Sequence, residues 1–352
     1  MIPIDRLRPV PFPNNMGMVR YFMALCVVVA HYCELAGWDY HFPVDSYTAV
    51  GGFFALSGFL VYGSYVRRRS LKDYIRRRGR RILPPYFATV LLFAFFLSSV
   101  STLSIPEYFT SGHFYRYLAA NLSFLNFLEP TLPGVFGDST IHAVNGSLWT
   151  MKVEWCLYLT VPAVVWLIWK LRANDKIVFG IIYVLSAAYR IGMQHLYEIT
   201  DNEIYDILGR QFMGQLMYFY AGVLLYFILD IFLKRRYLFA GAALALVCVG
   251  DYIPEFRITL YPAVVAVLVL FVSFTGKWGT WEGKHDNISY NIYLVHFPVI
   301  QLCIYWGFTQ SMGPFPGFLV SLGITVAVAA LINAIASRVG GRSSDGARRG
   351  RR

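Results

Sequence analysis

The sequence predicts an all-α, polytopic membrane protein of about ten transmembrane helices, with both termini in the cytoplasm. Three observations predict this class. Hydrophobic residues make up 57% of the 352 residues and charged residues only 14%, whereas soluble domains carry about 25% charged residues. Apolar runs of about 20 residues recur along the chain, and each is long enough to cross the hydrocarbon core of a bilayer. Lys and Arg residues gather in alternate connections between these runs, as they do in cytoplasmic loops.

The apolar runs define ten predicted spans. They cover residues 18–36, 47–66, 84–103, 147–169, 177–194, 211–233, 237–251, 258–275, 288–306 and 316–337. The short seventh run leaves the count open by one pair of helices near residues 237–275. With both termini in the cytoplasm, 26 of the 31 Lys and Arg residues fall in cytoplasmic segments, which fixes the expected orientation. The chain then forms one transmembrane domain, residues 1–337, followed by a basic cytoplasmic tail, residues 338–352, that we expect to be disordered.

Charge and cysteine usage exclude two kinds of partner. A net charge of +11 suggests nucleic acid in a soluble protein, but here the positive charge follows the predicted membrane topology. The five cysteines are scattered, mostly within apolar runs, and form no C-x-x-C motif. We therefore expect neither a nucleic-acid partner nor a metal site.

Ionisable groups inside membrane spans are functional candidates, because burying them is costly. The strongest candidates are His31, Lys152, Glu154, Arg190 and His296.

The first span carries Arg20 and His31 on one face. Eleven residues separate them, which on a helix is about 20° of rotation and about 16 Å of rise. A cation at the cytoplasmic mouth and a titratable base deeper in the same groove would suit an acyl or phosphoryl donor that enters from the cytoplasm. The alternative is a topology-setting Arg20 and a hydrogen-bonded structural His31.

The fourth span carries Glu154, with Thr150 and Tyr158 on the same helix face at i−4 and i+4. Lys152 points about 200° away, so a local ion pair is not expected. Glu154 and His31 would form an acid/base pair in which the carboxylate sets the imidazole tautomer. The alternative for Glu154 is a polar contact between helices.

The segment 67–81, predicted to be a cytoplasmic loop, holds nine Lys and Arg residues in fifteen positions. Its arginines Arg76, Arg77, Arg80 and Arg81 cluster over about one and a half helical turns. Guanidinium groups match phosphate oxygens bidentately. The segment therefore binds either a phosphorylated cytosolic ligand, such as a nucleotide or coenzyme A, or anionic lipid headgroups.

Two further spans carry small or polar residues. The second span places Ser57 among glycines at 51, 52 and 58, which permit either close helix contact or room for a ligand chain. The ninth span contains Tyr293 and His296. We expect His296 to make a polar contact rather than to act as the catalyst.

Five motifs in order along the chain resemble the acyltransferase-3 family of transmembrane acyltransferases. They are Arg20-x10-His31, FFALSGFL at 53–60, RRRGRRILPPY at 76–86, SLWTMKVEWCLYL at 147–159 and ISYNIYLVH at 288–296. Each motif is weak alone, but five in register over most of the chain are specific.

Members of this family typically move acyl groups from coenzyme A thioesters onto sugars of extracytoplasmic glycans. The resemblance implies an O-acyltransferase of the bacterial inner membrane that transfers an acyl group, acetyl above all, from cytosolic acyl-CoA. The acceptor would be a sugar hydroxyl of an extracytoplasmic or lipid-linked glycan, such as an exopolysaccharide. The donor is a substrate, and no permanently bound cofactor is implied.

The resemblance also assigns roles to individual residues. His31 would be the catalytic base, and Glu154 matches the acidic residue that follows the Ser-Leu-Trp signature. The residues expected to bind the donor are Arg20, Ser57, Arg76, Arg77, Arg80 and Arg81. The candidates for lining the substrate site are Trp149, Lys152, Tyr293 and His296. Many relatives carry an added hydrolase-like domain that is lacking here, so this protein would complete transfer alone or hand the acyl group to glycan-assembly proteins.

Two other classes remain open at this stage. A transporter or flippase of a lipid-linked anion would also use the basic segment and the buried charges, although no inverted repeat supports it. A sensor or scaffold in a glycan-assembly complex would bind the donor without turnover.

Overall fold

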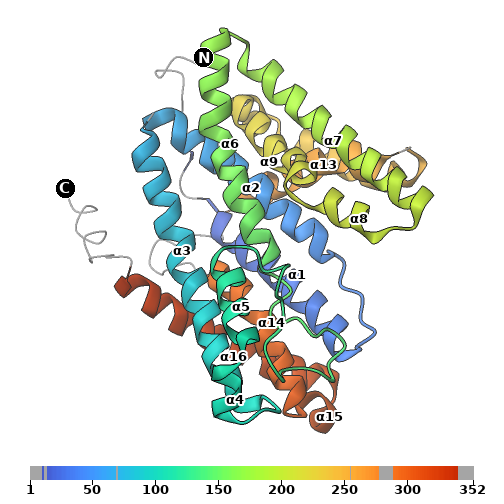
Figure 1. The fold of residues 1–352 in the computed structure, drawn as a ribbon. Coiled ribbons are helices and arrows are strands. Elements are labelled where there is room, and N and C mark those ends of the chain that lie inside the picture. The colour runs from blue at the N-terminus through green and yellow to red at the C-terminus, as the bar shows by residue number, and fades with distance from the viewer. Residues whose placement is uncertain (1–9, 12–13, 69, 254, 277–287, 340–352) are drawn as a thin grey trace, which may run out of the picture. The chain divides into compact units, whose positions relative to one another are not determined.

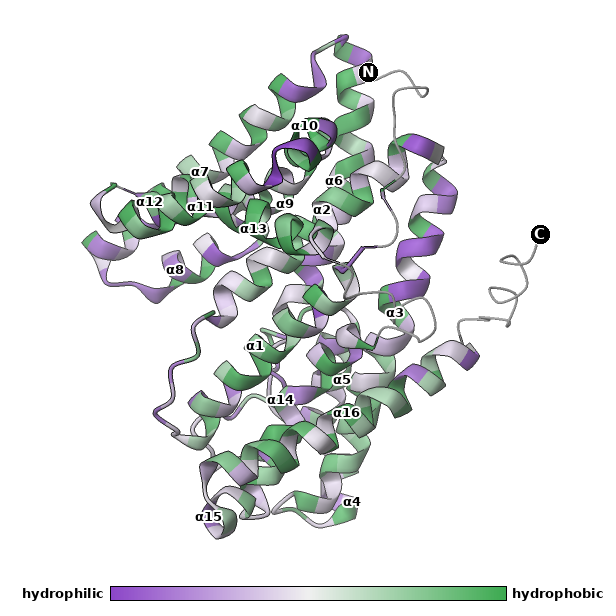
Figure 2. Cartoon of the chain, turned by 180° about the vertical axis from the view of Figure 1, so that it is seen from behind, coloured by the Kyte–Doolittle hydropathy of each residue, from purple (hydrophilic) through white to green (hydrophobic). Residues whose placement is uncertain are grey.

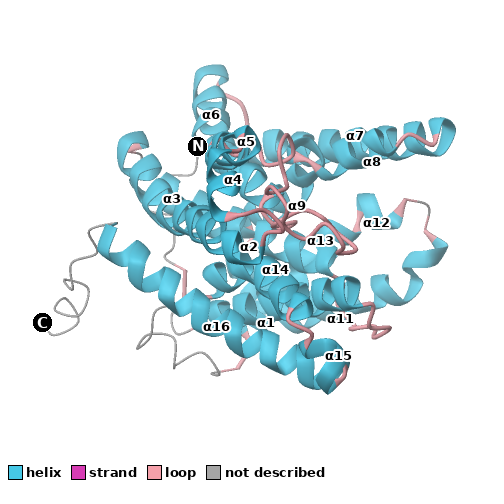
Figure 3. Ribbon diagram, turned by 60° about the horizontal axis from the view of Figure 1, so that its bottom comes forward, coloured by secondary structure: helices cyan, strands magenta, loops and turns pink. Residues whose placement is uncertain are grey.

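The computed structural model describes residues 10–11, 14–68, 70–253, 255–276 and 288–339. Within these ranges every regular element is an α-helix or a short 3-10 helix, as Figure 3 shows. The all-α prediction is therefore confirmed for this part of the chain. The predicted disordered tail lies, from residue 340 onward, outside the described residues.

The chain divides into two compact units. The first unit comprises Met1–Met23, Val44–Tyr74 and Val153–Asp286, and the second comprises Ala24–Pro43, Ile75–Lys152 and Asn287–Arg352. Three long helices contribute residues to both units, namely α1 (Met16–Ala36), α3 (Leu71–Phe96) and α6 (Trp149–Leu171).

The first unit is built around the contact of α2 (Ser46–Arg68) with α9 (Phe212–Phe227). The α9 helix also packs against α7 (Asp175–Thr200) and α13 (Tyr261–Phe274) (Figure 1). The remaining elements of this unit are α8 (Glu203–Arg210), α10 (Leu229–Lys234), α11 (Arg236–Val249), a 3-10 turn (Gly250–Tyr252) and α12 (Phe256–Thr259).

Glycines let the backbones of α2 and α9 touch. A Cβ atom added to Gly58 would lie 1.9 Å from the carbonyl oxygen of Phe219, and one added to Gly222 would lie 1.9 Å from that of Ala55. Neither position accepts a side chain, since such distances are far below van der Waals contact. Of the two roles open for the small residues of the second span, close helix contact is the one observed at Gly58.

The second unit is organised around α14 (Ser289–Tyr305), whose side chains are almost all buried. It packs against α16 (Pro314–Val339), and α15 (Phe308–Met312) contacts both of these helices (Figure 1). The remaining elements of this unit are a 3-10 turn (Leu97–Val100), α4 (Ile105–Thr110) and α5 (Gly112–Leu122).

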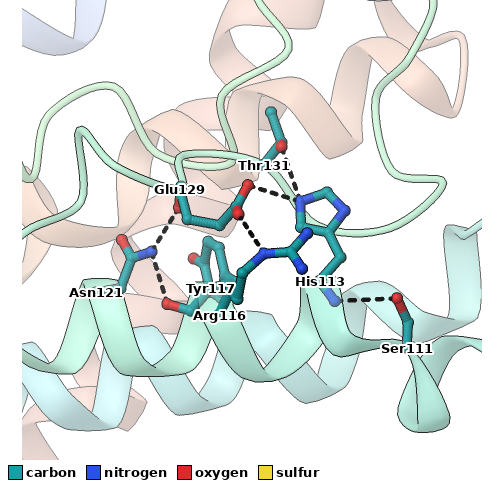
Figure 4. A network of polar contacts seen from close by, with 7 residues as sticks. All are labelled: Ser111, His113, Arg116, Tyr117, Asn121, Glu129 and Thr131. Carbon is teal, nitrogen blue, oxygen red and sulfur yellow. Dashed lines mark hydrogen bonds and ion pairs between the residues drawn. The ribbon is translucent and has the colours of Figure 1, made fainter.

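A polar network fastens the connection after α5 onto that helix (Figure 4). The Glu129 carboxylate lies 2.9 Å from His113 Nε2 and 3.1 Å from Arg116 Nε. The Asn121 amide donates to the Glu129 carbonyl at 3.0 Å and to the Tyr117 carbonyl at 2.9 Å. The long irregular segment between α5 and α6 therefore has a fixed start, although it contains no helix of its own.

Each of the ten predicted apolar ranges contains a helix, with the range 211–233 divided between α9 and α10. Among the residues that the structure describes, six helices are long and apolar enough to cross a membrane: Met16–Ala36, Ser46–Arg67, Leu71–Val100, Trp149–Leu171, Asp175–Thr200 and Pro314–Arg338. The helices α11 and α13 are apolar but shorter. A full set of ten crossings and the cytoplasmic placement of both termini remain predictions.

The basic segment differs from the expected loop. From Leu71 onward it is helical and continuous with the third apolar run, and Figure 2 shows the change from hydrophilic to hydrophobic residues along α3. Pro84 and Pro85 lie inside this helix. They cannot donate to the carbonyls of Arg80 and Arg81, so the helix loses two backbone hydrogen bonds where the basic part meets the apolar part.

We expect Gly58→Ala to lower the free energy of unfolding by about 1–3 kcal/mol, because the added methyl group overlaps the α9 backbone. Thermal unfolding of the purified protein in detergent measures the change as a lower melting temperature. Gly241→Ala is the matched control, since Gly241 also lies within a helix and an added Cβ meets nothing within 4 Å. Equal melting temperatures for both variants would contradict the proposed backbone contact.

Candidate active site

His31 and His296 form a hydrogen-bonded pair in the second unit. The Nδ1 atom of His31 lies 2.7 Å from Nε2 of His296. The two rings are stacked, with centroids 5.0 Å apart and planes inclined by 13°. His296 is fully buried on α14, whereas His31 is partly exposed on α1. The polar contact expected of His296 is thus a contact with the predicted catalytic base.

The partners of His296 determine where the protons lie. Its Nδ1 atom is 2.8 Å from the carbonyl oxygen of Tyr293, which can only accept a hydrogen bond. Nδ1 of His296 therefore carries the proton, and in the neutral ring Nε2 is an acceptor. His31 must then donate from Nδ1, which leaves Nε2 of His31 unprotonated. An imidazole held in this tautomer can act as a general base.

A proline frees a backbone carbonyl in the helix turn that carries His296. Pro298 lies within α14 and has no N–H group, so it frees the carbonyl of Leu294 four residues earlier. The side-chain amide of Asn145 donates to this carbonyl at 2.8 Å. The buried acceptor created by Pro298 is thereby satisfied, as buried carbonyls require.

The residues that follow Asn145 hold the same turn. Ser147 donates from its hydroxyl to Oδ1 of Asn145 at 2.6 Å, and this hydroxyl also lies 3.3 Å from the Tyr293 carbonyl. A Cβ on Gly146 would lie 2.7 Å from the ring of Phe297. That ring packs edge-on against His31, with centroids 5.2 Å apart. The segment 145–147 therefore positions both the carbonyl and the aromatic ring that surround the histidine pair.

The other predicted residues of the second unit lie on α14, α6 and α3. The Tyr293 and Thr150 hydroxyls are 2.9 Å apart. The Lys152 ammonium lies 4.6 Å from the centre of the Phe127 ring, a cation–π distance. Trp149, the first residue of α6, is partly exposed.

The four candidate donor-binding arginines lie on the first turns of α3. Arg76 and Arg80 are exposed, and Arg77 and Arg81 are partly exposed. Their spacing of i, i+1, i+4 and i+5 places all four on one side of the helix. This arrangement offers a row of guanidinium groups along consecutive turns.

The remaining candidates, Arg20, Ser57 and Glu154, belong to the first unit. The hydroxyl of Tyr158 donates to a Glu154 carboxylate oxygen, as their i, i+4 spacing predicts, and the Tyr74 hydroxyl donates to the Tyr158 carbonyl at 2.7 Å. Because Glu154 and His31 belong to different units, orientation of His31 by Glu154 remains a prediction.

Comparison with known proteins gives the chemistry of this fold. The family model described as an acyltransferase domain, that of the acyltransferase-3 family, matches residues 14–334. The chain belongs to the acyltransferase-3 family. It is an acyltransferase for groups other than aminoacyl groups, and its apolar helices indicate a membrane protein.

Named relatives agree with this membership. Nodulation protein 10 of Rhizobium leguminosarum bv. viciae is 28% identical, over 90% of this chain and 90% of that protein. The O-acetyl transferase of Shigella phage Sf6 is 30% identical, over 42% of this chain and 44% of the relative. The acyltransferase MdmB of Streptomyces mycarofaciens is 27% identical, over 44% of this chain and 39% of the relative. No solved structure matches the chain.

We expect Asn145→Ala to lower the free energy of unfolding by about 1–3 kcal/mol, because it leaves the buried Leu294 carbonyl without a donor. Thermal or denaturant unfolding in detergent measures the loss. Asn126→Ala is a suitable control, since Asn126 is also buried but its Oδ1 has no hydrogen-bond partner among the described residues. A variant Asn145→Ala as stable as Asn126→Ala would show that the amide does not hold the α14 turn.

Proposed function

We propose that this protein is an O-acetyltransferase that moves the acetyl group of cytosolic acetyl-CoA to a sugar hydroxyl of an extracytoplasmic or lipid-linked glycan. The observation that carries the proposal is the hydrogen-bond chain from His31 Nδ1 through His296 to the Tyr293 carbonyl, from which we infer that Nε2 of His31 carries no proton. The name of the phage relative, O-acetyl transferase, supports acetyl as the transferred group. Family membership favours an enzyme over the transporter or scaffold alternatives.

In the proposed reaction, Nε2 of His31 takes the proton of the sugar hydroxyl as its oxygen attacks the thioester carbonyl. The tetrahedral intermediate collapses, the C–S bond breaks, and the imidazolium returns the proton to the leaving thiolate of coenzyme A. The alternative route relays the acetyl group through an acyl intermediate. His296 accepts the hydrogen bond from Nδ1 of His31 throughout, which stabilises the imidazolium and keeps the ring oriented.

The other candidate residues would bind the two substrates. Arg76, Arg77, Arg80 and Arg81 present guanidinium forks suited to the phosphates of coenzyme A. Arg20 lies on the same continuous helix as His31, so the calculated spacing of about 16 Å along the groove applies to it. Ser57 completes the proposed donor site.

On the acceptor side, Tyr293 lies within the turn that carries His296, and we place it with Trp149 and Lys152 at the acceptor. Glu154 would act with His31 as the second catalytic residue. The proposed location is the inner membrane of a bacterium, in contact with membrane lipids and glycan-assembly proteins.

His31→Ala should reduce acetyl transfer by at least about 100-fold, the usual effect of removing a general base. Inverted membrane vesicles that receive acetyl-labelled acetyl-CoA and a glycan-lipid extract report transfer as label in the glycan fraction. His195→Ala should retain full transfer, since His195 is an exposed histidine of the first unit. Wild-type transfer by an inserted His31→Ala protein would remove His31 from the mechanism, and no label with wild type would argue against acetyl transfer to these glycans.

His296→Phe should lower kcat by about 10–100-fold with a smaller change in the KM for acetyl-CoA, because the ring that accepts from His31 Nδ1 is lost. His296→Gln should recover part of the rate, since its side-chain oxygen can accept the same hydrogen bond. Steady-state kinetics of the purified variants measures both constants. A rate for His296→Gln no better than for His296→Phe would show that His296 serves packing rather than orientation of His31.

A further inference from the structure

Arg190 lies in a predicted membrane span of the first unit, and nothing in the proposed reaction uses it. It is fifteen residues beyond the start of α7 at Asp175, about 22 Å along the helix axis. The Asp175 end follows the basic segment that contains Lys170 and Arg172, which the charge distribution predicts to be cytoplasmic. Arg190 therefore lies in the half of α7 that is predicted to face the extracytoplasmic side of the membrane.

One tyrosine ring lies against the guanidinium group, and a second tyrosine feels its charge. The Arg190 guanidinium carbon lies 5.0 Å from the centre of the Tyr47 ring, and Tyr47 is the second residue of α2. The charge of Arg190 also acts on the hydroxyl of Tyr218, a buried residue of α9. The Tyr218 ring fills the space left by Gly51, where an added Cβ would lie 2.5 Å from the ring.

One polar group of this cluster is left without a partner. Arg190 Nη1 is buried and has no hydrogen-bond partner among the described residues. A buried donor without a partner costs about 1–3 kcal/mol, and more when it is charged. Such an arrangement is typical of a site that a ligand completes.

The nearby carboxylates are already engaged elsewhere. Asp45 accepts hydrogen bonds from the backbone N–H of Thr48 at 2.7 Å and from its hydroxyl at 2.8 Å. Asp206 pairs with Arg210 one turn along α8. Within the part of the chain that the structure describes, Arg190 therefore has no ion-pair partner. A partly buried guanidinium without an ion pair would be stabilised by an anion from outside the chain.

We propose that Arg190, together with Tyr47, binds a phosphate group carried by a membrane lipid. A guanidinium fork matches two oxygens of a phosphate, and a tyrosine hydroxyl beside it can donate a further hydrogen bond. Tyr47 lies at the end of α2 opposite the basic residues Arg67 and Arg68, so the site lies near a membrane surface. The phosphate belongs to a phospholipid headgroup or to the diphosphate of a lipid-linked sugar. The second source rests on the proposed function, since that lipid would be the acceptor.

Binding of defined lipids to the purified protein tests the site without any turnover. The probes are phosphatidylglycerol, undecaprenyl diphosphate and, as a control without phosphate, diacylglycerol, with affinity measured by native mass spectrometry. Wild type should bind a phosphate-bearing probe, and Arg190→Met should weaken this binding by about tenfold or more. Arg257→Met is the matched control, because Arg257 also stacks on a tyrosine, 4.9 Å from the centre of the Tyr261 ring, but is exposed.

The two probes distinguish the source of the phosphate. Weaker binding of phosphatidylglycerol by Arg190→Met assigns the site to a phospholipid headgroup. Weaker binding that is confined to undecaprenyl diphosphate assigns it to a lipid-linked substrate. Equal binding of both probes by wild type and Arg190→Met would overturn the proposal. If Arg190→Met fails to fold, Tyr47→Phe decides, since weaker binding supports the site and unchanged binding overturns it.

Failure of the proposed function would leave a different signature from failure of the phosphate site. His31→Ala should bind these lipids like wild type, since the binding measurement requires neither donor nor transfer. Absence of acetyl transfer by the wild-type protein, with its lipid binding intact, would contradict the proposed reaction alone.

Discussion

The hydrogen bond from His296 to the carbonyl of Tyr293 sets the direction of the hydrogen bond between the two histidines, and so the form of the proposed catalytic base. A backbone carbonyl has no proton to give, so one ring nitrogen of His296 is fixed as the donor and the other as the acceptor. His31 then has one allowed tautomer. Everything that positions this carbonyl, including Ser147 and the α14 turn, acts on the reactivity of His31 through that single constraint.

The α14 turn also shows how a missing helix hydrogen bond can position a neighbouring segment. Pro298 removes one backbone donor, and Asn145 replaces it from a distant part of the sequence. The hydrogen bond from Asn145 also fixes the end of the connection that leads into α6. The start of this connection is held on α5, where the Asn121 amide donates to the Glu129 carbonyl. A long segment without regular structure is thereby ordered by a few buried polar contacts rather than by its own helices.

The sequence was sufficient to predict the helices but only part of the site. Apolar periodicity located every one of the ten ranges, because burial in lipid or protein requires long apolar runs. It did not predict that α3 starts at Leu71, since charged residues and two prolines usually indicate a loop. His31 was identified from its unusual place in a span, whereas its contact with His296 joins residues 265 positions apart, which no local pattern encodes. Pro298 within an apolar run was the available signal of a free carbonyl, but nothing in the sequence pointed to Asn145 as its partner.

The hydrogen bonds of the histidine pair end at a backbone carbonyl, which has a consequence for a protein embedded in a membrane. A continuous row of titratable side chains between two aqueous phases would conduct protons and dissipate the gradient across the bilayer. His296 passes its hydrogen bond to an atom that cannot bind and release a proton at physiological pH, so the row stops there. The pair can therefore place a general base within a membrane-spanning helix without extending a proton path beyond His296.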